Sequence, residues 1–224
     1  MRSNMRWLSQ WKGEKKKMID RAELKRRAKN NMSGNMGMLI VCLVIVGALT
    51  MVCNMIPYVG AIGSICISGP LSLGSAYIYL NLTKGFAPDV NVLFSGFQRF
   101  VDTLVLTLLI SIFTFLWSLL FLVPGIIKSI SYSQAYYILA EHPEMTAKEA
   151  LDESIDMMDG HKMDYFVLGL SFIPWLLLVS VTCGLAALYV APYMTATYAN
   201  FYLAIKSPVE PNINGNFTDN YYQA

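Results

Sequence analysis

The sequence predicts an all-α integral membrane protein, and two observations carry that prediction. Of the 224 residues, 55% are hydrophobic and only 14% carry a charge. The hydrophobic residues are gathered into blocks, several of which approach or reach the roughly 20 residues that a helix needs to cross a bilayer. This composition, distributed in this way, is typical of a membrane protein.

Six apolar segments are expected to form transmembrane helices. Five stand out by length and composition, whereas residues 124–140 form a shorter segment that contains Lys128, so its complete crossing stays open. The expected spans are 38–56, 60–82, 101–123, 124–140, 164–182 and 185–205. Six crossings would return the chain to the side of the membrane where it began.

The basic residues predict which side that is. Eleven of the 17 Lys and Arg residues precede Asn30, and such residues accumulate on the cytoplasmic side of membrane proteins. We therefore expect both termini in the cytoplasm, together with the longer connections 83–100 and 141–163. The basic start runs into polar residues instead of a signal-peptide pattern, so the first span is expected to serve as an uncleaved insertion signal.

Three regions follow from this topology. Residues 1–36 form a basic cytoplasmic arm and an amphipathic helix, residues 37–206 form a single transmembrane domain, and residues 207–224 form a polar, disordered tail. Both Met1 and Met18 are candidates for the true start of the protein.

A weak threefold pattern runs through the chain. Each unit has a short amphipathic helix, a glycine, a membrane helix, a tight turn and a returning helix with a proline and tyrosines. The glycines, Gly34, Gly96 and Gly160, are 62 and 64 residues apart. The returning segments run from Pro70 to Lys84, from Pro124 to Glu141 and from Pro192 to Lys206. The pattern favours three helical hairpins, although membrane composition alone could produce it.

The short helices have apolar stripes too narrow and too short to span a bilayer. They would lie on the inner leaflet or cover the cytoplasmic end of the bundle. The clearest one opens with a capping box, Thr146-x-x-Glu149, and ends at Gly160. The predicted stripes are Leu24, Ala28 and Met32; Val90, Leu93, Phe94 and Phe97; and Ala147, Ala150, Leu151, Ser154, Ile155 and Met158.

Hydroxyl side chains form stripes on two of the predicted spans and are expected to face the protein interior. The two stripes are Ser64, Ser68, Ser72 and Ser75 in the second span, and Thr103, Thr107, Ser111, Thr114 and Ser118 in the third. Small and hydroxylated residues let membrane helices pack closely. The alternative is a path lined for a polar solute.

Lys128 lies at membrane depth, where an ionisable residue is costly and suggests function. It follows Pro124 by four residues, close enough to the outer interface for the side chain to reach the headgroups as an anchor. The alternatives are a buried cation that binds an anionic ligand or headgroup, and a catalytic lysine. The candidate intramembrane polar site comprises Lys128, Ser131, Tyr132, Thr107, Ser111 and Thr114.

Two opposite charge fields are expected on the cytoplasmic side. Residues 1–30 have a formal charge of +8, and residues 141–164 have a formal charge of −6. The basic arm could bind anionic lipid, where each basic residue near the surface contributes about 1 kcal/mol, or dock on the acidic helix, or serve only to set the topology. The candidate lipid contacts are Lys15, Lys16, Lys17, Lys25, Arg26 and Arg27.

Motifs for other chemistry are absent from the sequence. The four cysteines, Cys42, Cys53, Cys66 and Cys183, lie singly in apolar segments without metal-ligand spacing. Neither a nucleophile motif nor a phosphate-binding loop is present. We therefore expect no enzyme activity, no cofactor, no metal and no nucleic-acid partner.

Four stretches resemble one family: "GPLSLGSAYIYLNL", "LFSGFQRF", "FLWSLLFLVPGIIKSISYSQAYYILAEHPEMTAKEALDESIDMMDGHK" and "APYMTATYANFYLAI". They are similar to the uncharacterised bacterial multi-pass membrane proteins of domain of unknown function 975, from about Met18 to Lys206. The resemblance implies a protein of the bacterial plasma membrane and supplies no catalytic residues.

The expected function is that of a non-enzymatic membrane component with an envelope-associated or scaffolding role. Its partner is the lipid bilayer, including anionic lipids, and a protein partner or a second copy stays open. The alternative is a small transporter or channel for a polar or anionic solute.

Overall fold

The computed structural model describes residues 20–55, 59–120 and 122–206, and these residues contain helices and no β-strand, which confirms the all-α prediction. The helices are α2 (Arg21–Met32), α3 (Met36–Asn54), α4 (Val59–Thr83), α5 (Val90–Ser95), the 3-10 helix η1 (Gly96–Arg99), α6 (Phe100–Leu120), α7 (Leu122–Tyr132), α8 (Ala135–Glu141), α9 (Ala147–Met157), α10 (Lys162–Leu170), α11 (Ile173–Val181) and α12 (Ala187–Lys206).

Four stretches of the described residues are long and apolar enough to cross a membrane. They are Met36–Cys53, Gly63–Thr83, Val90–Leu119 and Lys162–Val181. Two of the six predicted spans, 124–140 and 185–205, are not among them. The first is divided into α7 and α8 by a turn at Ser133 and Gln134, and α12 is less apolar because it carries Thr195, Thr197 and Asn200 besides its tyrosines.

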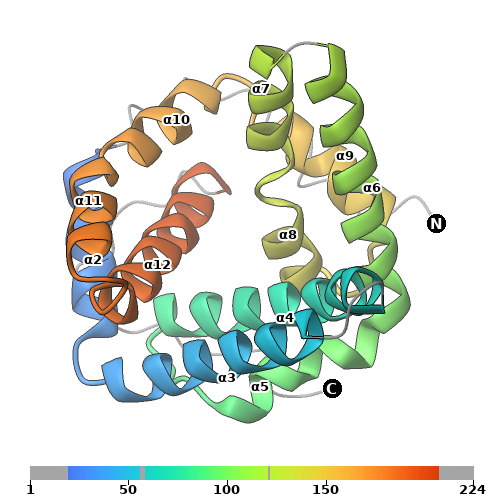
Figure 1. Ribbon diagram of the computed structural model, residues 1–224. Helices are drawn as coiled ribbons and strands as arrows, with labels where there is room; N and C mark the ends of the chain where they lie inside the picture. The colour runs from blue at the N-terminus through green and yellow to red at the C-terminus, as the bar shows by residue number, and fades with distance from the viewer. Residues whose placement is uncertain (1–19, 56–58, 121, 207–224) are drawn as a thin grey trace.

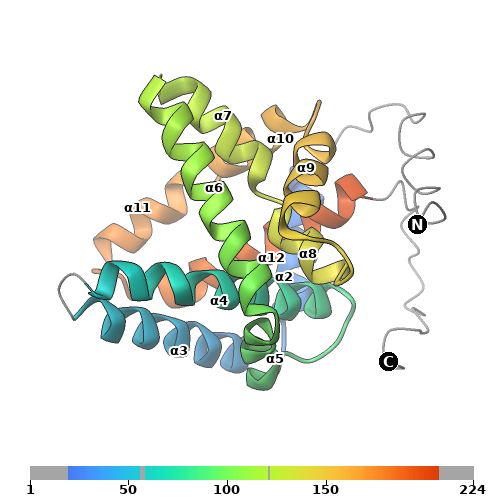
Figure 2. The ribbon, with the colours of Figure 1, turned by 90° about the vertical axis from the view of Figure 1, so that its right-hand side faces the viewer.

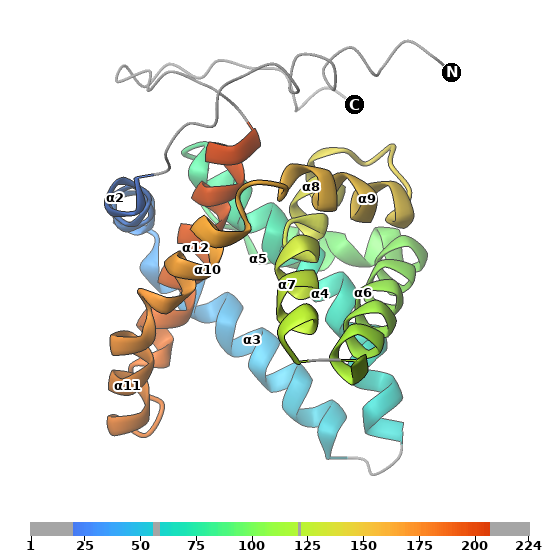
Figure 3. The same cartoon turned by 90° about the horizontal axis from the view of Figure 1, so that it is seen from above.

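Consecutive helices run side by side in pairs. α3 packs against α4, α6 against α7, and α11 against α12. In Figure 3 the C-terminal ends of α3, α6 and α11 point to one side of the molecule, whereas α2, α9 and the C-terminal end of α12 lie on the opposite side. The turn predicted near residue 57 lies outside the described residues. Pro124, where the fourth span was expected to begin after a turn, lies inside α7.

Helix α4 forms the centre of the bundle, beside α3 in Figure 2. In its candidate span 56% of the residues are buried, against 11%, 17% and 11% in the other three. The other candidate spans instead expose large apolar side chains such as Val52, Phe115, Leu119 and Val181. Exposed apolar area on this scale marks a surface that water does not cover, so these outer faces fit a hydrocarbon environment.

Glycines allow the backbone of α4 to touch its neighbours. A Cβ atom at Gly96 would lie 2.0 Å from the carbonyl oxygen of Pro70, and one at Gly74 would lie 1.9 Å from that of Leu93. The sequence pattern treats Gly34, Gly96 and Gly160 as equivalent, but only Gly34 and Gly160 have a positive φ. Gly96 instead allows the backbone of η1 to lie directly against the backbone of α4.

The short helices α2 and α9 cover the bundle with the predicted stripes. Leu24, Ala28 and Met32 of α2 are buried, and α2 packs against α12. In α9 the predicted capping box is present at Thr146 and Glu149. Of its predicted stripe, Ile155 is half-buried and the other residues are buried: Ala147, Ala150, Leu151, Ser154 and Met158.

Helix α5 differs from the other two short helices. Leu93 is buried as expected, but Phe94 and Phe97 are 43% and 37% exposed. The contact of Gly74 with Leu93 and of Gly96 with Pro70 brings the backbone, and not the phenylalanine face, against α4. The phenylalanines therefore point outward.

Candidate functional site

A cavity of about 340 Å³ lies between α3, α4, the junction of α7 and α8, and α12. Figure 1 shows α4, α8 and α12 around the middle of the molecule, with the remaining helices outside them. Of the eleven described residues that line the cavity, eight carry a hydroxyl: Thr50, Ser68, Ser72, Ser75, Ser133, Tyr136, Tyr137 and Thr195. The others are Val46, Leu71 and Ala76, so no lining residue is charged.

The serines of α4 reach the cavity because of their helical spacing. Ser68, Ser72 and Ser75 are four and three residues apart, which places them on one face. Of the four serines expected to face the protein interior, Ser72 and Ser75 line the cavity and are half-buried. Ser68 lines it but is exposed, and Ser64 is not among the lining residues. Among the described residues, Ser72 and Ser75 have no hydrogen-bond partner, whereas Ser68 donates to the Ile65 carbonyl at 3.0 Å.

The hydroxyl stripe of α6 is buried only in part. Thr103 is fully buried, and the Thr107 hydroxyl lies 2.8 Å from the Tyr136 hydroxyl, which connects α6 to the cavity lining. Ser111 is exposed, and Thr114 Oγ1 is buried without a partner among the described residues. The first half of α6 meets α4, since Gly69 lies against Thr103 and Thr107.

Lys128 lies apart from the cavity. Its side chain is half-buried on α7, and Nζ lies 5.1 Å from the centre of the Trp117 ring, within range of a cation–π interaction. Ser131 is buried and donates to the Ile127 carbonyl at 3.0 Å, and Tyr132 is buried beside Phe113. Of the six residues of the candidate polar site, Thr107 makes a hydrogen bond to a residue that lines the cavity, Tyr136.

The break between α7 and α8 is held by Ser154 of α9. The Ser154 hydroxyl donates to the Ser131 carbonyl at 2.7 Å and accepts from the Gln134 backbone N–H at 3.2 Å. All three residues are buried, and backbone groups freed at a helix break need such partners inside a membrane protein. Ser133, in the break itself, lines the cavity.

The three returning segments end in one ionic cluster. Lys206 Nζ lies 2.6 Å from Glu141 Oε1, Lys84 Nζ lies 4.0 Å from the same oxygen, and the Tyr202 hydroxyl donates to Oε2 at 2.7 Å. Burial raises the pKa of Glu141, but the hydrogen bond and charge of Lys206 outweigh it, with help from Tyr202 and Lys84, and the pKa is lowered. The carboxylate therefore stays ionised and connects α4, α8 and α12.

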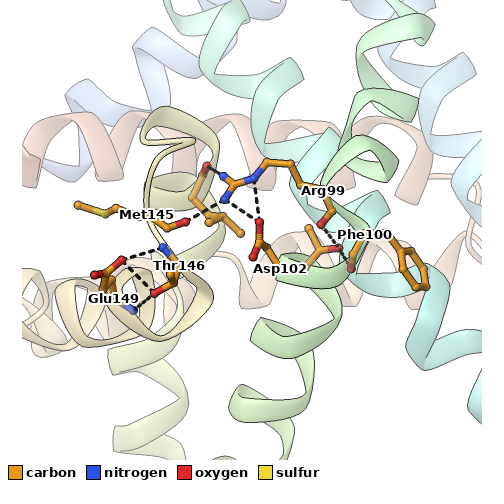
Figure 4. Close-up of polar contacts among 8 residues, drawn as sticks. Arg99, Phe100, Asp102, Met145, Thr146 and Glu149 are labelled. Carbon is orange, nitrogen blue, oxygen red and sulfur yellow. Dashed lines mark hydrogen bonds and ion pairs between the residues drawn. The ribbon is translucent and has the colours of Figure 1, made fainter.

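Arg99 fixes the loop between α8 and α9, a role that sequence reasoning missed. As Figure 4 shows, its guanidinium contacts Asp102 and reaches the carbonyl oxygen of Met145. The two Nη2 distances are both 2.8 Å, and Nη1 donates to the Leu139 carbonyl at 3.3 Å. The only sequence signal is a single arginine at the start of an apolar segment.

The basic residues of α2 are engaged to different degrees. Lys25 Nζ donates to the Ser171 carbonyl at 3.1 Å and lies 4.4 Å from the Phe172 ring centre. Burial, followed by the charge of Arg21, lowers the pKa of Lys25. Arg26 and Arg27 pair with Glu23 on the same helix but remain exposed. Lys15, Lys16 and Lys17 lie outside the described residues.

The fold and the site define a helical membrane protein built around a hydroxyl-lined cavity. The chain matches the family model of a protein of unknown function, DUF975, over residues 18–131 and 119–208, so it belongs to this family, as the resemblance suggested. No curated protein and no solved structure matches the chain.

Proposed function

We propose that the chain crosses the bacterial plasma membrane six times as three hairpins, with both termini in the cytoplasm. Two observations support this topology: the basic N-terminal residues, and the position of α2, α9 and the end of α12 on one side of the molecule. In this arrangement α7 and α8 together make the fourth crossing and α12 makes the sixth. Their polarity is tolerated because they are packed among other helices.

Side-specific thiol labelling tests the topology at Lys128→Cys, with Cys42, Cys53, Cys66 and Cys183 replaced. Labelling from outside only is expected, because Lys128 lies six residues after the start of α7, about 9 Å at 1.5 Å per residue, and a lysine at that depth can reach the outer interface as an anchor beside Trp117. Lys148→Cys, exposed on α9, is the matched cytoplasmic control. Labelling of Lys128→Cys from the cytoplasm would contradict this topology.

The role that the geometry supports best is that of a non-enzymatic membrane component acting at the inner leaflet. The observation that carries it is the exposed phenylalanine pair, Phe94 and Phe97, whose ring centres lie 6.2 Å apart. They sit on the short α5–η1 segment that packs against α4, at the level where an interfacial helix inserts apolar side chains. Arg26 and Arg27 are exposed to anionic headgroups, whereas Lys25 is held inside.

Quenching by brominated lipids tests this placement. Phe97→Trp, in a variant without the natural tryptophans, is expected to be quenched strongly in bilayers, and Asp152→Trp on the exposed face of α9 only weakly. Replacing Arg26 and Arg27 with Gln is expected to reduce enrichment of phosphatidylglycerol around the protein in mixed bilayers. Equal quenching at the two positions, or an unchanged lipid preference, would count against the role.

A second candidate function, transfer of a polar solute, is favoured by the hydroxyl-lined cavity. Solute flux into proteoliposomes, measured by light scattering after an osmotic step, tests it. Flux at the rate of empty vesicles would leave the cavity without a transport role.

A further inference from the structure

We propose that the cavity between α3, α4, α8 and α12 is a binding site for a small uncharged solute rich in hydroxyl groups. Its volume of about 340 Å³ falls at the lower end of the range of roughly 300–1,000 Å³ for ligand pockets. By the share of liquid volume that each water takes, this is room for about eleven waters. A polyol of five or six carbons fits such a space.

The lining determines the chemistry of the ligand. Hydroxyls from α3, α4, the α7–α8 junction and α12 meet at the cavity. Those of Thr50, Ser68, Ser133 and Thr195 donate to backbone carbonyls three or four residues earlier, so they can accept from a ligand but not donate to it. Among the described residues, Ser72 and Ser75 hydroxyls have no partner, so they are available to a ligand. A hydroxylated solute matches both capacities, whereas a purely apolar ligand would leave them unsatisfied.

An anion is disfavoured at the same place. None of the described lining residues carries a charge, and Lys128 is directed to Trp117. The cations at the ends of α4 and α12, Lys84 and Lys206, already surround Glu141. An ion in a low-dielectric cavity without a counter-charge is costly, so the site discriminates against carboxylates. This narrows the solute class from polar or anionic to polar and uncharged.

The broken helix is an independent reason to assign a ligand site here. Ser133 lies eleven residues after the start of α7 and Ser72 eleven residues before the end of α4, which places both about 16 Å from a membrane face at 1.5 Å per residue. The cavity is therefore near the middle of a bilayer core of about 30 Å. Helices interrupted near this depth form the substrate sites of many transporters.

Saturation-transfer NMR on the full chain in nanodiscs, with xylitol and xylonate as probes, tests the assignment. The two molecules differ in one terminal carboxylate. Saturation transfer to xylitol is expected, with xylonate binding at least about tenfold more weakly, a factor that corresponds to about 1.4 kcal/mol. Absence of transfer to xylitol, or equal transfer to both probes, would overturn the proposal.

Matched variants locate the binding. Ser72→Leu fills the cavity and is expected to abolish the xylitol signal, whereas Ser111→Leu, on the exposed face of α6, is expected to preserve it. The thermal unfolding temperature of each variant shows whether the fold is kept. Ser75→Ala, which removes the hydroxyl without filling the cavity, is expected to weaken binding severalfold. Retained xylitol binding in a folded Ser72→Leu protein would contradict the site.

Measuring binding and flux separately distinguishes the proposed binding site from the proposed transport function. The binding site specifies which solute would be transported, but it does not require that transport occurs. Xylitol binding without flux would leave the site in place and remove transport. Flux of xylitol that persists in Ser72→Leu, with no saturation transfer, would place transport elsewhere and leave the binding site in place.

Discussion

The replacement Glu141→Gln is expected to destabilise the bundle through the ionic cluster that joins three returning helices. The variant keeps the size of the side chain and its ability to accept from Tyr202, but it removes the negative charge between Lys84 and Lys206. Those two ammonium groups would then lie near each other without a counter-charge. Because α4, α8 and α12 all end at this cluster, the loss acts on the whole inner bundle.

The magnitude follows from the geometry. Removing one partner of a buried ion pair costs about 3–5 kcal/mol. The Glu141 side chain is 11% exposed, but those of Lys206 and Lys84 keep 28% and 30% exposure, so water solvates the ammonium groups that remain. We therefore expect a loss of about 2 kcal/mol, well above the roughly 0–1 kcal/mol of a surface pair.

Thermal unfolding in detergent measures this loss. For a chain of this length, about 2 kcal/mol corresponds to a decrease of roughly 4–8 °C in Tm. Glu144→Gln is the control, because Glu144 lies three residues away with its side chain 63% exposed and contacts only His142 among the described residues. Equal unfolding temperatures for the two variants would refute the role assigned to the cluster.

The same cluster predicts a pH dependence. The pKa of Glu141 is lowered in the folded protein relative to its ordinary value of 4.5. Its stabilising contribution is thus fully present above about pH 4.5 and is lost as the pH falls through the lowered pKa. Below pH 4.5 the wild-type protein should lose stability more steeply than Glu141→Gln. Parallel pH profiles would be inconsistent with this carboxylate as the titrating group.

Three further substitutions test the packing. Gly96→Ala would press a methyl group into α4 and should lower the free energy of unfolding by about 3 kcal/mol. The control Gly37→Ala places its methyl group in open space and should be neutral or stabilising. Equal Tm values for the two variants would contradict the close contact. Ser154→Ala should lower stability by about 1–3 kcal/mol, because two buried backbone groups lose their partner; an unchanged Tm would argue against it. Arg99→Lys should increase proteolytic cleavage near Met145 severalfold in limited digestion, and an unchanged pattern would exclude this restraint.

The sequence was sufficient to predict the helices and helix faces that depend on periodicity and local signals. The α9 capping box and the stripes of α2 and α9 are present as predicted, because i, i+3 and i+4 spacing alone determines which side of a short helix is apolar. The inward direction of Ser72 and Ser75 was predictable for the same reason. Helical spacing alone therefore predicted the α4 side of the cavity lining, but not the residues of the other helices that complete it.

The features that depend on tertiary contacts were not predictable in the same way. The turn at Ser133 and Gln134 has neither glycine nor proline, and it is stabilised by Ser154 from 20 or more residues further along the chain. The exposure of Phe94 follows from the backbone contact at Gly96, which periodicity does not report. The sequence pattern aligned Lys84, Glu141 and Lys206 as the ends of corresponding segments. It did not predict that the Glu141 carboxylate lies beside both lysines.

The three units of the predicted repeat take different forms in the structure, and this difference locates the adaptable part of the fold. The returning helix of the first unit, α4, is continuous and central, and that of the third, α12, is also continuous. Only the second unit has a broken returning helix, and the break is held by Ser154, which belongs to the third unit. Because Ser133 in the break also lines the cavity, a small movement of α9 would change the break and the cavity together. Coupling of α9 to ligand binding in the proposed site would therefore pass through Ser154.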